Sequence, residues 1–141
     1  MDTKTYLSQV YKLQRLIDVK NADLESYREL SSSILGSYFE EIHNATRNTD
    51  AQFVKYLHKI DEIEREIAKD IEKLNQLKFE IGTEIDKLED LNERLVLRYR
   101  HLLCMEWKDI AVKLHYSKRW VQRLHDRAVD HLDYKRESDK N

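Results

Sequence analysis

The fold of this chain is decided by residues 107–132, which read WKDIAVKLHYSKRWVQRLHDRAVDHL. Apolar residues recur in this stretch every three or four positions, which is the spacing of one face of a helix. The pattern is interrupted at Ser117, whose hydroxyl can accept a hydrogen bond from a backbone N–H in the first turn of a following helix. The stretch therefore predicts two helices, 107–114 and 118–132, joined by a tight turn.

A third helical pattern precedes this pair over residues 94–103, where leucines and a tyrosine share one face. In the turn between the second and third helices, Tyr116 is expected to fill the corner that they form. Three short helices with a tight turn before the last one are typical of a helix-turn-helix, in which the last helix enters the major groove of DNA.

The last helix has a basic face opposite its apolar stripe of Val121, Leu124, Ala128 and Leu132. The candidate DNA-binding residues of this helix and its cap are Ser117, Lys118, Arg119, Gln122, Arg123 and Arg127. Lysine and arginine can bond guanine, and glutamine can pair with adenine. Basic residues of the preceding helices can neutralise flanking phosphates, and these are Arg94, Arg98, Arg100, Lys108 and Lys113. We therefore expect double-stranded DNA as the partner.

Charge is distributed unevenly along the 141 residues. The chain has 25 Lys and Arg against 27 Asp and Glu, and this net charge of −2 predicts no polyanion partner by itself. Residues 94–141, however, hold 12 basic and 7 acidic side chains, whereas residues 56–93 hold 6 and 12. An acidic segment joined to a basic one indicates that a polyanion would bind at the basic end.

The composition predicts an all-α protein. There is no proline and there are two glycines, which excludes barrels, sandwiches and other folds that need many tight turns. From Tyr56 to Leu95, apolar residues recur in steps of three and four, close to the seam of a coiled coil or a long helical hairpin. A second stripe over residues 3–35 would pack on this seam, within one chain or between two subunits.

Local signals suggest where these long helices end. The serines of 31–33 and Gly36 weaken helix continuation. Residues 43–50 are polar and aperiodic and predict a loop, with a new helix starting at Thr49 through a capping box. Gly82 is expected to mark close packing or a kink.

The C-terminal residues resemble a known family of DNA-binding domains. The strings LRYR at 97–100 and EWKDIAVKLHYSKRWVQRLH at 106–125 are similar to the helix-turn-helix of sigma-70 region 4. With a long helical N-terminal half, they resemble in particular the phage-encoded ArpU and RinA regulators, which are late-gene transcription activators of phages and integrated elements in Gram-positive bacteria. The resemblance implies that Arg127 lies near the DNA backbone, and that bases and nearby phosphates are faced by Lys118, Arg119, Gln122 and Arg123.

Two positions depart from the pattern of that family. His115 stands where glycine is usual, at a helix end that often needs a positive φ. Glu106 stands where a serine N-cap is usual. Trp120 lies between the apolar stripe and the basic face, so packing against the helical arm, contact with a phosphate or sugar, and contact with a partner protein all remain open for it.

No catalytic or metal-binding constellation is found in the sequence. The histidines have no H-E-x-x-H spacing, and Cys104, the single cysteine, fits a small residue in a turn between helices. We therefore expect no enzyme activity, no metal and no cofactor. No apolar window of about 18 residues exists, so we expect no membrane span. The resemblance to phage regulators implies a place in the cytoplasm of the bacterial host, on the nucleoid.

We therefore predict three parts: a helical hairpin or coiled-coil arm over 1–93, a helix-turn-helix DNA-binding domain over 94–135, and a flexible tail over 136–141. The expected function is sequence-specific transcription regulation, with a homodimer or higher oligomer formed through the arm and host RNA polymerase as a further partner. One alternative is a DNA-packaging recognition subunit of the small-terminase type, which would assemble as a ring. Another is an adaptor whose helix-turn-helix binds a protein such as RNA polymerase.

Overall fold

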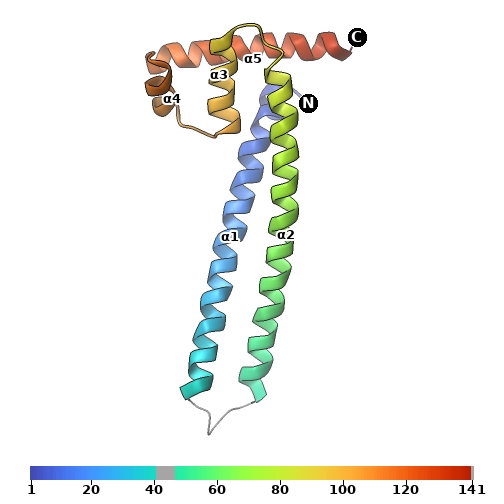
Figure 1. Cartoon of the computed structure of the whole chain (residues 1–141), viewed down its shortest axis with the longest axis vertical. Coiled ribbons are helices and arrows are strands. Elements are labelled where there is room, and N and C mark those ends of the chain that lie inside the picture. The colour runs from blue at the N-terminus through green and yellow to red at the C-terminus, as the bar shows by residue number, and fades with distance from the viewer. Residues whose placement is uncertain (41–46, 141) are drawn as a thin grey trace. The chain divides into compact units, whose positions relative to one another are not determined.

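The computed structural model describes residues 1–40 and 47–140, and these are all-helical, with no strand among them. The predicted all-α class is confirmed. The elements are α1 (Thr3–Glu40), α2 (Arg47–Ile85), α3 (Leu91–Leu97), the π-helix η2 (Arg98–Leu102), α4 (Trp107–Leu114) and α5 (Lys118–Lys140) (Figure 1). By their contacts, the residues form two compact units, one of Met1–Gln14 with Leu74–Asn141 and one of Arg15–Lys73.

In the unit of Arg15–Lys73, α1 and α2 run antiparallel, since ion pairs join position 20 to position 70 and position 28 to position 64. Lys20 pairs with Asp70 at 2.6 Å, and Arg28 pairs with Glu64 at 2.9 Å. The apolar seam predicted for α2 includes Ile71, and the prediction is wrong at that position. Ile71 is 42% exposed, and Asp70 is buried on the seam instead because Lys20 supplies its partner.

In the other unit, α3 and α4 both pack against α5 (Figure 1). The fully buried side chains of α3, α4 and α5 are Val96, Leu97, Ile110, Val121, Ala128 and Leu132. The first residues of α1 belong to the same unit, because the Thr3 hydroxyl donates to Asp133 at 2.6 Å and accepts from Arg136 at 3.0 Å. The boundary predicted at residue 93 therefore falls inside this unit.

Several predicted helix ends differ from the structure. Helix α1 continues through the serines and Gly36 to Glu40. Helix α2 begins at Arg47, before the predicted start at Thr49, so residues 47–50 are helical, while 43–46 lie outside the described residues. Residues 136–140, predicted as a flexible tail, continue α5, and the Asp139 carboxylate there pairs with Lys87 at 2.8 Å.

The long periodicity predicted from Tyr56 to Leu95 is broken after Ile85, where α2 ends. Leu88 is buried in the following turn, whereas Leu91 is 58% exposed. The Asp90 carboxylate accepts a hydrogen bond from the Asn92 backbone N–H at 3.0 Å and so caps the start of α3. Gly82 marks close packing, as predicted, because the Arg98 guanidinium donates to its carbonyl at 3.3 Å.

Candidate nucleic-acid interface

The turn between α4 and α5 is held by backbone geometry and one side-chain cap. His115 has φ 59° and ψ 38°, which is the left-handed conformation expected at this position. The backbone N–H of Tyr116 donates to the Ala111 carbonyl, and that of His115 donates to the Val112 carbonyl. This pair of bonds is a Schellman motif, which ends a helix sharply. Glu106, at the other end of α4, makes no side-chain cap hydrogen bond.

The start of α5 is capped as the sequence predicts. The Ser117 hydroxyl accepts a hydrogen bond from the Trp120 backbone N–H at 3.1 Å. Tyr116 does not fill the corner between the helices, since it is 41% exposed and its ring meets Trp120 edge-on at 6.4 Å. Its hydroxyl instead accepts a hydrogen bond from the Asn92 side-chain amide at 3.4 Å, which links the turn to α3. Trp120 is 44% exposed.

The buried and exposed faces of α5 follow the predicted pattern. The predicted stripe of Val121, Leu124, Ala128 and Leu132 is buried, and it also includes His125 and Val129. Among the candidate contact residues, Gln122 is half-buried, whereas Lys118, Arg119 and Arg123 are exposed. These three cations have no ion-pair partner in the part of the chain that the structure describes. The first two turns of α5 therefore carry three solvent-facing positive charges.

Four of the five supporting basic residues divide into two groups, while Arg94 is half-buried, with its Nε buried and without a hydrogen-bond partner in the described chain. Arg98 pairs with Asp86 at 2.7 Å, and Arg100 donates to the Met105 carbonyl at 3.0 Å while lying over the Trp107 ring. The guanidinium groups of these two arginines are therefore engaged by other groups of the protein. Lys113 is exposed, and Lys108 is exposed with only a long 3.5 Å contact to Glu106, so both can reach an external anion.

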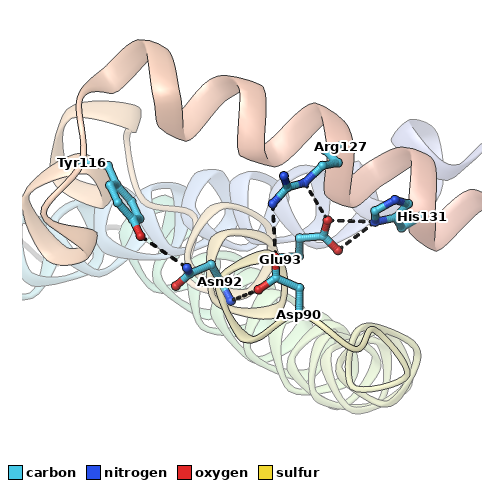
Figure 2. A network of polar contacts seen from close by, with 6 residues as sticks. All are labelled: Asp90, Asn92, Glu93, Tyr116, Arg127 and His131. Carbon is cyan, nitrogen blue, oxygen red and sulfur yellow. Dashed lines mark hydrogen bonds and ion pairs between the residues drawn. The ribbon is translucent and has the colours of Figure 1, made fainter.

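Arg127 differs from the other predicted DNA contacts because it is engaged by α3 (Figure 2). Its Nε donates to Glu93 at 3.0 Å, and its terminal nitrogen donates to Asp90 at 3.1 Å. His131, one turn further along α5, pairs with the same Glu93 carboxylate at 2.8 Å. The Glu93 side chain is 3% exposed, so this network is anchored on a buried carboxylate.

This network was not predicted from the sequence, although part of its signal is local. Arg127 and His131 are four residues apart, which places them on one face of α5. The acidic run that includes Asp90 and Glu93 lies more than 30 residues earlier in the chain. Only the packing of α3 on α5 brings the two groups together.

A second polar contact lies under α4, between two histidines. The Nε2 atoms of His101 and His125 are 2.8 Å apart, and the Trp107 ring meets His125 edge-on at 4.9 Å. The Asp126 carboxylate lies 3.3 Å from His125 Nδ1 and can only accept, so Nδ1 carries the proton and His125 Nε2 accepts from His101. Burial lowers the pKa of His101 to about 3, and the nearby His125 and Arg100 add to that shift.

The described histidines are not grouped as metal ligands. Within residues 1–40 and 47–140, no group of three or more His, Cys, Asp or Glu side chains is arranged to hold a metal ion. Cys104 lies in the turn between η2 and α4, as predicted, with a positive φ of 54°. Among the described helices, none has the length and apolar character needed to cross a membrane.

Comparison with known proteins assigns a family without a function. The model of a family described as "Protein of unknown function (DUF1492)" matches residues 38–133, which is more than half of the chain, so the chain belongs to that family. The match spans α2 to α4 and most of α5. No curated protein and no solved structure matches the chain.

Proposed function

We propose that this DUF1492 family member is a sequence-specific, double-stranded-DNA-binding transcription regulator whose reading surface is the start of α5. The observation that carries the proposal is a difference among the basic residues of the domain, some of which have ion-pair or hydrogen-bond partners while others have none among the described residues. Lys118, Arg119 and Arg123 project from the first two turns of α5 without an ion-pair partner in the described chain. Arg98, Arg100 and Arg127 are instead bound by groups of the fold.

Unpaired cations at the start of a capped helix suit a duplex. Phosphate contacts supply most of the affinity of such proteins, and side chains that reach base edges supply the specificity. In this proposal, the base edges are faced by Arg119, Gln122 and Arg123. Lys118 contacts a nearby phosphate. Lys108 and Lys113 of α4 hold the flanking backbone. Trp120, which is partly exposed beside Tyr116, packs against a sugar or phosphate at the edge of the groove.

The wider assignment rests on the small size of this module and on the resemblance of its sequence to the ArpU and RinA regulators. A single module of this size covers a short site, which favours two half-sites and a homodimer joined through α1 and α2. We propose that the protein is a late-gene activator of a phage or integrated element, that it works in the bacterial cytoplasm, and that it contacts host RNA polymerase.

Footprinting on the DNA that flanks its own gene, with the molar mass measured in parallel, tests the proposal. We expect protection of two half-sites separated by about one helical turn of DNA, from a particle of two subunits. A ring of many subunits would indicate the packaging role instead. Failure to bind any duplex at low salt would contradict DNA binding and would favour the adaptor.

A further inference from the structure

The charge on one exposed face of α5 changes from positive to negative along the helix. Arg119, Arg123, Asp126 and Asp130 are separated by four, three and four residues, so they lie in one row along the helix. All four side chains are exposed. The row therefore presents two positive charges near the N-terminus of α5 and two negative charges directly after them.

The basic side chains of α5 between residues 124 and 136 do not offset this change, because each of them contacts another group of the protein. Arg127 and His131 are paired with Glu93 and Asp90, as Figure 2 shows. Lys135 lies 3.8 Å from Glu89, and Arg136 lies over the Tyr6 ring and donates to Thr3. Over residues 124–136, no basic side chain of α5 remains without such a contact.

The length of the basic part matches the groove. The helix rises about 7.5 Å from residue 118 to residue 123, and the major groove of B-DNA is about 8.5 Å deep. Asp126 lies about 4.5 Å beyond Arg123 along the axis, and Asp130 about 10 Å beyond it. For a phosphate that contacts Arg123, the Asp126 carboxylate is within the Debye length of about 8 Å at physiological salt, so repulsion is felt there, whereas Asp130 lies just beyond it and its repulsion is more strongly screened.

We propose that duplex contact along α5 ends at Arg123, and that Asp126 and Asp130 enforce this end by repelling the phosphates beyond it. The inference rests on the proposed function and adds a determinant of specificity. The two aspartates disfavour binding modes in which α5 lies lengthwise along the phosphate backbone of DNA of random sequence. They do not disfavour the binding mode in which the first two turns of α5 enter the major groove at a cognate site. In this binding mode, Arg127 stabilises the packing of α3 on α5 and does not contact the duplex.

The test uses the full chain with Asp126→Asn and Asp130→Asn combined, and Glu137→Gln as a control that removes a single exposed carboxylate from the same helix. Asparagine keeps a side-chain oxygen to accept the hydrogen bond from His125, and Glu137 is an exposed acidic residue further along α5. The probe is a mixed-sequence duplex of about two helical turns, titrated by fluorescence anisotropy. We expect the double variant to bind it roughly three- to tenfold more tightly, with a smaller gain on the footprinted site.

Two results would overturn the inference. One is a double variant whose affinity for the mixed-sequence duplex matches that of Glu137→Gln. The other is an Arg127→Gln variant that folds and weakens the salt dependence of duplex binding as much as Arg123→Gln does. Either result leaves the proposed function standing if the wild type binds the duplex and Arg123→Gln reduces that binding. A wild type that binds no duplex overturns both.

Discussion

The buried carboxylate of Glu93 on α3 accepts a hydrogen bond from Arg127 Nε on α5 at 3.0 Å. This contact joins two elements that are 34 residues apart in the chain. A buried carboxylate is tolerated only when donors satisfy it, and here both donors, Arg127 and His131, come from α5. The orientation of α5 against α3 is therefore tied to this pair.

Arg127→Ala is expected to lower the free energy of unfolding by about 1–3 kcal/mol, because it removes one of the donors to a buried charge. Chemical denaturation measures the change. Arg123→Ala is the control on the same helix, since its side chain is exposed and without an ion-pair partner in the described chain, and a change of at most about 0.5 kcal/mol is expected. Equal losses from the two variants would contradict the role of the network.

Arg123→Ala is expected to weaken binding to the footprinted site by about 1–3 kcal/mol while leaving the helix content intact. The reason is the loss of a charged contact in the groove. Gel-shift competition measures the affinity, and circular dichroism measures the helix content. Arg65→Ala removes the same charge from an exposed position on α2 and should leave binding nearly unchanged. An unchanged operator preference in Arg123→Ala would refute its reading role.

The histidine pair predicts a loss of stability in acid. The pKa of His101 is lowered by burial from 6.5 to about 3, and burial also lowers that of His125, although Asp126 opposes the shift there. Below about pH 6.5 the unfolded chain therefore binds protons that the folded chain excludes. From this pH down to about 3, His101 lowers the free energy of unfolding by up to about 1.4 kcal/mol per pH unit.

Denaturation across this pH range, compared between wild type and His101→Gln, isolates the histidine contribution from that of the carboxylates. Glutamine keeps a donor for His125 Nε2 and does not titrate over the range. The variant should show a shallower decline of stability below pH 6.5. A wild type and a variant with parallel pH profiles would argue against the assignment.

His115→Gly is expected to raise the free energy of unfolding by about 0.5–1 kcal/mol. His115 has a positive φ, where a Cβ is unfavourable, and glycine removes that cost at some expense in chain entropy. Thermal unfolding measures the gain. His115→Ala keeps the Cβ and should bring no gain, so stabilisation of similar size by alanine would show that the backbone conformation is not the cause.

The turn and the start of α5 were predictable because their signals are local. Ser117 caps the helix that follows it, and the stripe through Val121 and Leu132 depends only on helical spacing. The end of α2 at Ile85 was not predictable from periodicity, because Leu88 and Leu91 continue the spacing through a turn. The apolar pattern alone does not distinguish a bent path from a straight one.

The partners of the basic residues could not be predicted from the sequence. Lys118 and Arg127 belong to the same basic set, and only the packing of α3 on α5 pairs one of them with a buried carboxylate. The same holds for Asp70, which is buried on an otherwise apolar seam because Lys20 from the antiparallel helix reaches it. Tertiary contacts of this kind leave no trace in local spacing.

The salt dependence of duplex binding tests the central claim most directly. We expect log K to fall linearly with log[salt], with a slope of about −0.9 for each phosphate contact. In a variant with Lys118, Arg119 and Arg123 changed to glutamine, the slope should become shallower by about 2–3. The same change at Lys59, Arg65 and Lys69 of α2 should leave it unaltered. A slope in the first variant equal to that of the wild type would contradict the assignment of the start of α5 as the DNA-binding surface.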